Sequence, residues 1–126
     1  MIDKSELYVL QFHASWCGPC QRMKDSFKSQ VVLDELKNYG NAKFLEKQEK
    51  PLNAILVDVD ENKKEAENFF ASSIPLVVIV DRKRNVYKRL SGYTNPDALA
   101  KWLKNPCYNK DCSPIHQYSE TSFINE

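Results

Sequence analysis

Residues 16–20 read Trp-Cys-Gly-Pro-Cys, and they separate the apolar run of residues 7–12 from an amphipathic stretch. This order places two thiols, three positions apart, where a predicted strand passes into a predicted helix. The N-terminus of a helix carries about half a positive charge and unpaired N–H donors, and both favour a thiolate over a thiol. Because the thiolate is the attacking species in thiol–disulfide exchange, the motif predicts redox chemistry at Cys17 and Cys20.

Length and composition are typical of one globular domain. The chain has 126 residues, of which 42% are hydrophobic and 28% charged, and a chain of this size buries roughly two-thirds of its unfolded surface. Its 18 basic and 17 acidic residues nearly cancel, so the overall charge does not favour nucleic acid as a partner. We interpret the basic run at residues 82–84 as a solvated hairpin turn rather than a phosphate site.

The N-terminus and the cysteine content bear on the compartment. Residues 1–6 do not show a basic region followed by an apolar one, and no stretch approaches about eighteen apolar residues. We therefore expect no membrane contact and a cytoplasmic protein. Four cysteines are too few for a disulfide-framed scaffold of this length, so redox or metal use is the better interpretation of the first pair.

Hydrophobic periodicity predicts the secondary structure. Strands are expected at residues 6–13, 53–59, 76–80 and 86–90. Helices are expected to begin near Pro19, after a break at residues 29–30, at residues 60–62 and at an Asn95 cap. The first strand carries apolar residues on both parities, so both of its faces are expected to be buried. The helix after residue 60 is expected to bury Ala66, Phe69 and Phe70, whereas the polar segment 41–51 gives no clear pattern.

The element order is β-α-β-α-β-β-α, with the cysteine pair at the first strand–helix junction. A long segment crosses from the first strand to the second, as a parallel pair requires, and the last two strands can close as a hairpin. We therefore expect an α/β fold with a mixed four-stranded sheet flanked by helices. Residues 1–104 would form this domain. Residues 105–126 have no helical period and are expected to be an irregular or disordered C-terminal extension.

Three landmarks, in this order along the chain, resemble a thioredoxin-fold protein. They are the motif at residues 16–20, the dipeptide Ile74-Pro75, and Ser91-Gly92-Tyr93 before the last helix. The resemblance covers residues 6–104 and includes both thioredoxin and the thioredoxin-like domains of thiol:disulfide interchange proteins. It implies a cis peptide bond at Pro75.

The resemblance also implies a set of roles. Cys17 would be the nucleophile and Cys20 the resolving thiol, supported by Trp16, Gly18, Pro19 and Pro75. The substrate-binding residues would be Ile74, Gly92 and Tyr93. The implied activity is reduction of protein disulfides by a monomer without a bound cofactor, because the electrons reside in the two cysteines. A reductase would recharge the dithiol. An oxidase or isomerase, a non-catalytic binding module and a small zinc protein are the alternatives.

Three features depart from the family pattern. Only five residues precede the first predicted strand, so most of the family's N-terminal strand and helix is missing. The family's buried aspartate and a neighbouring lysine correspond to Gln11 and Leu56, and a family aromatic corresponds to His13. Gln11 cannot take a proton at neutral pH. His13 titrates near neutral pH, so it is a candidate for proton handling together with Gln11. The ordinary alternative is a hydrogen-bonded histidine.

Cys107 and Cys112 lie in the extension, with His116 nearby. Three interpretations stay open for them: two reduced and inert thiols, a second disulfide, or a metal site shared with Cys17 and Cys20. The spacing C-x4-C-x3-H is loose for zinc, which makes the metal site the weakest of the three.

Overall fold

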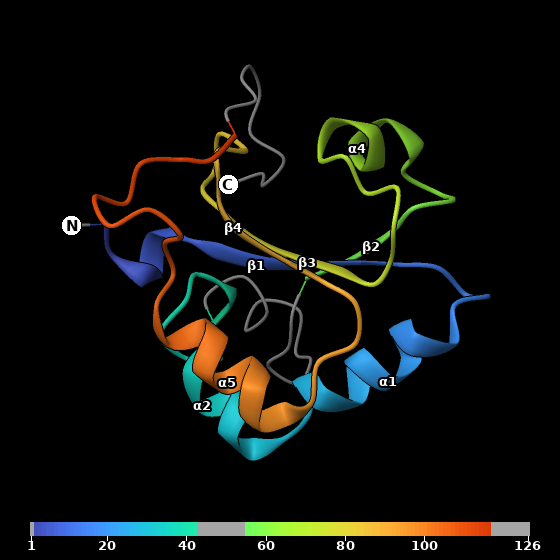
Figure 1. The fold of residues 1–126 in the computed structure, drawn as a ribbon, viewed down its shortest axis with the longest axis horizontal. Coiled ribbons are helices and arrows are strands. Elements are labelled where there is room, and N and C mark those ends of the chain that lie inside the picture. Colours follow the sequence, from blue (N-terminus) through green and yellow to red (C-terminus); the bar gives the residue numbers. More distant parts are fainter. Residues whose placement is uncertain (1, 43–54, 117–126) are drawn as a thin grey trace.

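A mixed four-stranded sheet forms the centre of the protein (Figure 1). The computed structural model describes residues 2–42 and 55–116. The strands are β1 (Tyr8–His13), β2 (Ile55–Asp58), β3 (Leu76–Val80) and β4 (Val86–Ser91), in the spatial order β2-β1-β3-β4. β1 pairs in parallel with β2 and antiparallel with β3, and β3 pairs antiparallel with β4. The expected α/β class and mixed sheet are confirmed.

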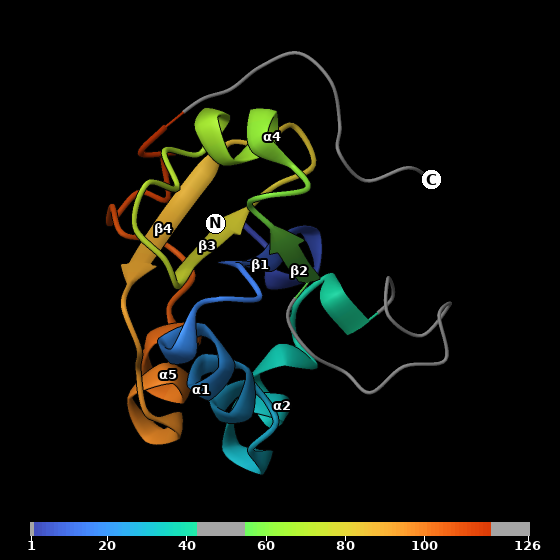
Figure 2. The same cartoon turned by 90° about the vertical axis from the view of Figure 1, so that its right-hand side faces the viewer.

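Helices cover both faces of the sheet. α1 (Gly18–Phe27), α2 (Gln30–Leu36) and α5 (Pro96–Lys104) lie on one face, and α4 (Lys63–Asn68) lies on the other (Figures 1 and 2). A 3-10 turn, η1 (Lys4–Glu6), precedes β1. The break expected near residues 29–30 is present, because Ser29 separates α1 from α2 with extended backbone angles. No helix in the described ranges is both long and apolar enough to cross a bilayer.

Two apolar clusters sandwich the sheet. On the side of α1, α2 and α5, the odd-numbered Leu7 and Val9 of the first strand region pack with Met23 and Leu103. On the side of α4, the even-numbered positions of β1 pack with Phe69, whose ring lies 5.4 Å from that of Phe12. Since side chains alternate across a strand, this arrangement buries β1 on both faces, as expected.

Phe70 is a correction to the expected core. It is 61% exposed, whereas its neighbour Phe69 is fully buried. α4 ends at Asn68, and Phe70 adopts a positive φ of 55°, so its side chain turns away from the sheet. Its ring makes an edge contact with His116. The prediction for Phe70 was wrong because it extended the helical period beyond Asn68, where α4 ends.

At Val9, just before the pairing of β1 with β2 begins at Leu10, a side chain supplies the hydrogen bonds to the β1 backbone. The fully buried Asn41 accepts a hydrogen bond from the Val9 N–H at 2.8 Å and donates one to the Val9 carbonyl at 3.1 Å. Its amide therefore satisfies two backbone groups as a neighbouring strand would. Most of the unassigned segment 41–51 and the first residues of the predicted second strand lie outside the described ranges.

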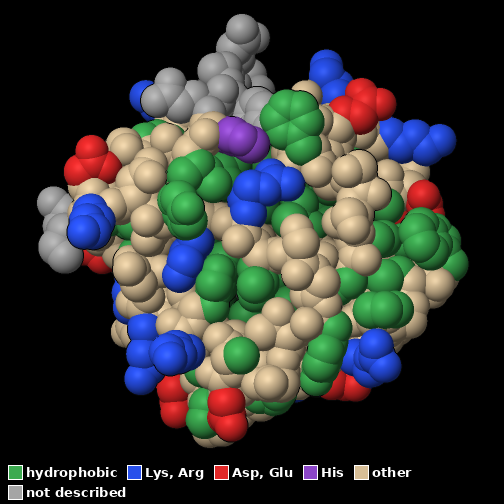
Figure 3. Space-filling view, viewed as in Figure 1, with side chains coloured by type: hydrophobic (Ala, Val, Ile, Leu, Met, Phe, Trp, Pro, Cys, Tyr) green, Lys and Arg blue, Asp and Glu red, His purple; other side chains and the backbone are tan. Residues whose placement is uncertain are grey.

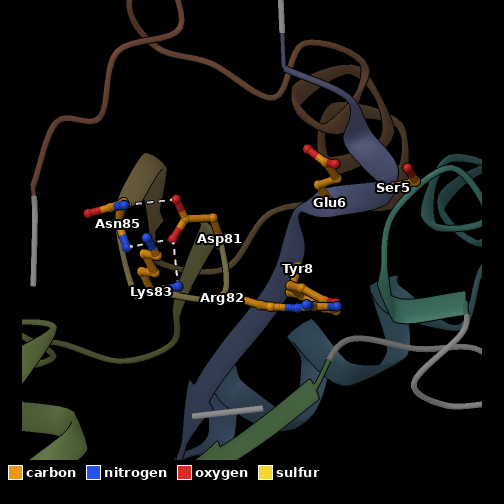
Figure 4. A pocket seen from close by; sticks show the side chains of 7 residues that line it. All are labelled: Ser5, Glu6, Tyr8, Asp81, Arg82, Lys83 and Asn85. Atoms are coloured by element: carbon orange, nitrogen blue, oxygen red, sulfur yellow. Dashed lines mark hydrogen bonds between the residues drawn. The ribbon is translucent and has the colours of Figure 1, made fainter. Parts of the chain in front are cut away.

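The basic run at residues 82–84 lies in the turn between β3 and β4, which confirms the hairpin. Arg84 is not solvated as expected, because it is largely buried in an ion pair with Glu65 at 3.0 Å. The Asp81 carboxylate accepts hydrogen bonds from the backbone N–H groups of Lys83 and Asn85 and from the Tyr87 hydroxyl. A shallow pocket beside this turn is lined by Ser5, Glu6, Tyr8, Asp81, Arg82, Lys83 and Asn85 (Figure 4). Its lining carries charges of both signs, which does not favour an anion.

After α5 the chain continues without helix or strand from residue 105 to residue 116, apart from one bridge between Val86 and His116. Cys107 and Cys112 are joined by a disulfide. Lys88 ties the start of this segment to β4, because its ammonium donates to the carbonyls of Trp102 and Asn105. The division at residue 104 into a domain and an irregular or disordered extension stays a prediction, and residues 117–126 lie outside the described ranges.

Candidate active site

Cys17 is the N-cap residue of α1. Its backbone is extended, and its sulfur accepts a hydrogen bond from the Cys20 N–H at 3.1 Å. Pro19 lies in the first turn of the helix, where its missing N–H leaves no partner unsatisfied. The strand–helix junction thus places the Cys17 sulfur against the unpaired N–H groups and the positive end of the helix dipole.

The two cysteines of the motif form a disulfide, with their Cα atoms 5.2 Å apart. Cys17 is 5% exposed and Cys20 is fully buried. Ala14, Val59 and Ile74 pack around the pair. A reagent that reaches this site therefore meets the Cys17 sulfur first, with the Cys20 sulfur directly behind it.

The Ile74–Pro75 peptide bond is cis, as the resemblance to thioredoxin-fold proteins implied. The Pro75 carbonyl accepts a hydrogen bond from the Gly92 N–H at 2.9 Å. Gly92 has a φ of +86°, a conformation that favours glycine. In residues 2–42 and 55–116, no hydrogen bond engages the peptide N–H or carbonyl of Ile74.

Two exposed aromatic side chains flank the cysteines. Trp16 is 69% exposed and donates from its indole N–H to the Asp60 carboxylate at 2.8 Å. Tyr93 is 45% exposed, and the Arg22 guanidinium lies 5.3 Å from its ring centre. In Figure 3, hydrophobic side chains gather at the side of the molecule where β1 passes into α1. The site therefore opens between apolar surfaces that polar partners hold in place.

Gln11 lies directly beneath the motif. It is fully buried, and its side-chain amide donates to the Cys20 carbonyl at 3.2 Å. Its Oε1 is buried and finds no partner in the described part of the chain. In the pairing of β1 with β2, Gln11 lies opposite Leu56, as the family resemblance implied. Leu56 is an exposed, uncharged residue.

His13 follows on the same face of β1. Burial lowers the pKa of His13, and the nearby charge of Lys24 lowers it further, whereas Asp58 and Glu61 oppose the shift. Its Nδ1 is buried without a hydrogen-bond partner in the described ranges. His13 is therefore held as a neutral ring at neutral pH, close to α1.

The structure brings together the motif, Ile74-Pro75 and Gly92-Tyr93, but it keeps the second cysteine pair apart. Cys107 and Cys112 lie near Val86, where β4 begins, whereas Gly92 follows the other end of β4. The alternative of a metal site shared by all four cysteines is therefore wrong, because the two pairs lie at opposite ends of the sheet and each pair is disulfide-bonded.

The sequence analysis assigned no site role to Asp60 or Arg22, which contact the exposed aromatic side chains of Trp16 and Tyr93. The position of Asp60 carried a usable signal. It follows the second strand, which is parallel to the first, and the carboxyl ends of parallel strands lie at the same edge of a sheet. Arg22 lies two residues beyond Cys20 on the exposed face of α1, and nothing in the sequence pattern singles it out.

Solved thioredoxin structures share this fold. The thioredoxin of Malassezia sympodialis matches with a TM-score of 0.55 at 20% identity, covering 81% of this chain and 78% of that one. The oxidised thioredoxin of Plasmodium falciparum matches with a TM-score of 0.54 at 24% identity, covering 81% and 82%. At these identities the likeness concerns the fold alone.

Sequence relatives agree with the fold. A thioredoxin of Chlamydia trachomatis is 32% identical over 100 residues, which cover 79% of this chain and 81% of that protein. An H-type thioredoxin of Fagopyrum esculentum is 30% identical over 99 residues, covering 79% and 72%. This likeness, together with the bonded pair at the head of α1, defines a protein disulfide oxidoreductase. The family model described as Thioredoxin matches residues 1–105, and the chain belongs to that family.

Proposed function

We propose that the protein mainly reduces protein disulfides by dithiol exchange, with Cys17 as the nucleophile and Cys20 as the resolving thiol. The observation that carries this proposal is the position of the Cys17 sulfur at the start of α1, where it accepts the Cys20 N–H. A helix N-terminus stabilises a thiolate. The Cys17 thiolate attacks one sulfur of the substrate disulfide, and the other substrate sulfur leaves as a thiolate.

The second step releases the substrate. The Cys20 thiol gives up its proton, and its sulfur attacks Cys17 in the mixed disulfide. The Cys17–substrate bond breaks, two electrons have passed to the substrate, and the Cys17–Cys20 disulfide has formed. The complete burial of Cys20 supports this order, because an external disulfide cannot reach its sulfur before that of Cys17.

We place the substrate against Ile74. Its peptide N–H and carbonyl have no partner in the described ranges, and its side chain packs against the cysteine pair. An extended substrate segment can pair with these groups as an added strand. The faces of Trp16 and Tyr93 would then contact the substrate with little regard to its sequence, which suits a reductase of many proteins.

Proton handling during the second step falls to Gln11 and His13 in this proposal. Gln11 holds the Cys20 carbonyl and keeps one free acceptor, Oε1, in the buried site. His13 is neutral at neutral pH because burial lowers its pKa, so it can accept the Cys20 proton. The rate of the second step would then fall below the pKa of His13. A His13→Gln variant with an unchanged pH profile would exclude this role.

The remaining parts of the proposal concern partners and compartment. The electrons reside in the two cysteines, so no bound cofactor is required. A reductase recharges the dithiol, and the substrates are disulfide-containing proteins. We expect a monomer that acts in the cytoplasm, without nucleic acid or membrane as a partner.

The reduction potential of the Cys17–Cys20 pair tests the direction. Equilibration with glutathione buffers, read by alkylation and mass spectrometry, should give a potential near the value of about −270 mV known for thioredoxin. A value at or above about −180 mV, as in protein disulfide isomerase, would instead indicate an oxidase or isomerase.

Single cysteine variants test the assigned roles. Cys17→Ser should abolish insulin reduction, and Cys20→Ser should accumulate a mixed disulfide between Cys17 and the substrate. Accumulation with Cys17→Ser instead would reverse the assignment. If a Cys17→Ser/Cys20→Ser variant kept full biological activity, the protein would be a binding module rather than an enzyme.

A further inference from the structure

We propose that the Cys107–Cys112 disulfide is a second thiol–disulfide exchange site. In this proposal the bond holds residues 105–116 over the outer edge of β4, and reduction by a dithiol from another molecule releases them. The proposal concerns the end of the sheet remote from Cys17 and Cys20. It does not depend on the direction in which that first pair works.

Residues 105–116 run around the edge of the sheet from one face to the other (Figures 1 and 2). Cys107, near their start, is 3% exposed and belongs to the apolar cluster on the side of α5. Ile115, near their end, packs against the cluster on the side of α4. The segment is therefore part of both cores, although it contains no regular element.

The segment supplies hydrogen-bond partners to β4 along its open edge. Tyr108 donates its N–H to the Tyr87 carbonyl at 2.9 Å, and Ile115 donates to the Val86 carbonyl at 2.7 Å. In return, the Val86 N–H donates to the His116 carbonyl at 2.8 Å. An uncovered edge strand would leave these groups free to pair with another chain, which is a common cause of aggregation.

The disulfide closes the turn that joins these contacts. Cys107 directly precedes Tyr108, and Cys112 stands three residues before Ile115. Cys112 has a φ of +57°, a strained conformation for a residue with a side chain. Within the turn, the Cys112 N–H donates to the Asn109 carbonyl at 2.9 Å, and exposed hydrogen bonds link Asn109, Asp111 and Ser113. Exposed hydrogen bonds contribute little net stability, so the turn depends on the cross-link.

The two sulfurs differ in access. Cys107 is buried, whereas Cys112 is half-buried at the margin of the cluster. A thiolate of the reductant therefore attacks the Cys112 sulfur, the disulfide breaks, and Cys107 leaves as a thiolate that takes up a proton. The second thiol of the reductant then attacks the mixed disulfide, forms the reductant's own disulfide and releases Cys112 as a thiol. Two electrons pass from the dithiol to the pair.

The dithiol must come from another molecule. β4 runs for six residues between the end that meets the segment and the end that leads to Gly92. At about 3.3 Å per residue, this strand holds the two disulfides much farther apart than the distance at which one sulfur can attack another. The Cys17 sulfur of the same chain therefore cannot reach Cys112 in the folded protein.

The test uses the full chain carrying Cys17→Ser/Cys20→Ser, which retains Cys107 and Cys112. The folded protein is titrated with dithiothreitol, free thiols are located by alkylation and mass spectrometry, and amide hydrogen exchange is followed by NMR. We expect complete reduction without denaturant. Reduction should speed exchange at the Tyr108, Ile115 and Val86 amides about tenfold or more, because local opening then becomes easier.

The Gly92 amide is the matched control within the same sheet. It donates to the Pro75 carbonyl at the far end of β4, so its exchange should not change on reduction. A second variant, Cys107→Ser/Cys112→Ser, should show the fast exchange even under oxidising conditions. If the disulfide resists dithiothreitol until the protein unfolds, the exchange site is refuted. If the three amides stay protected after reduction or in the second variant, the disulfide does not hold residues 105–116 on the edge of β4, and that part of the proposal is refuted.

Should the serine variant of the first pair fail to fold, the unmodified chain gives the same readout. Alkylation sites identified by mass spectrometry distinguish Cys107 and Cys112 from Cys17 and Cys20. The exchange site then requires that alkylation of both Cys107 and Cys112 rises with dithiothreitol in the absence of denaturant. Labelling of the first pair alone refutes it.

Discussion

Replacement of Gln11 by glutamate is the sharpest test of the buried site, because it changes one group and almost no volume. The Gln11 amide is fully buried and donates to the Cys20 carbonyl. In Gln11→Glu this donor becomes a carboxylate oxygen, and the residue paired with it on β2 is the uncharged Leu56. We expect a large loss of stability at neutral pH, and the same direction of change for Gln11→Asp.

The magnitude follows from two terms. Loss of the hydrogen bond to Cys20 costs about 1 kcal/mol. Burial without a cation raises the pKa of the new carboxyl, and a rise of about two units corresponds to about 2.7 kcal/mol at neutral pH. The total is about 3–4 kcal/mol. The folded protein then binds the proton more tightly than the unfolded chain. Both terms are therefore nearly absent at about pH 4, where the protonated carboxyl can also donate to the Cys20 carbonyl; they grow as pH rises from the unfolded pKa towards the raised pKa and stay constant above it.

Urea unfolding of the oxidised protein between about pH 4 and pH 8 measures both terms. Gln11→Met is the matched control, because it removes the same donor without adding a charge and should lose stability equally at every pH. If the glutamate variant were within about 0.5 kcal/mol of the parent protein at pH 7, or lost the same amount at every pH, Gln11 would not lie in an unpaired buried site.

Three further changes test other parts of the structure. Asn41→Leu removes two buried hydrogen bonds to the Val9 backbone, so we expect a loss of about 2–4 kcal/mol in urea unfolding; no loss would mean that water serves those groups equally well. Ser26→Ala removes the hydrogen bond from Ser26 to the Thr94 carbonyl at 2.8 Å, so it should cost about 1 kcal/mol in the same assay. The lowered pKa of His13 means that the unfolded chain binds its proton more readily, so stability should fall as pH drops below about 6.5, and His13→Gln should flatten that slope.

The sheet could be predicted because its strands carry local signals. The continuous apolar run Leu76–Val80 is fully buried, and it lies between β1 and β4 as a central strand should. The prediction for Phe70 was wrong because periodicity shows where a helix face points, and not where the helix ends. The hydrogen bonds of Asn41 could not be predicted, because they depend on where β2 starts beside β1.

The candidate site, like the fold, could be predicted from the sequence only in part. The cysteine pair and its place at the start of α1 follow from a motif of five residues and the capping preferences around it. The tie between Trp16 and Asp60 joins residues 44 positions apart, and it exists only because β1 and β2 are parallel and in register. The path of residues 105–116 could not be predicted, because this irregular backbone meets β4 through scattered hydrogen bonds and one bridge that leave no period in the sequence.

The positions of the two tryptophans give the protein built-in optical probes. Trp16 directly precedes the cysteine at the head of α1, whereas Trp102 packs against the apolar cluster on the side of α5. A disulfide quenches the emission of a nearby indole. The fluorescence of a Trp102→Phe variant, which retains only Trp16, would therefore report on the state of the first cystine without a label.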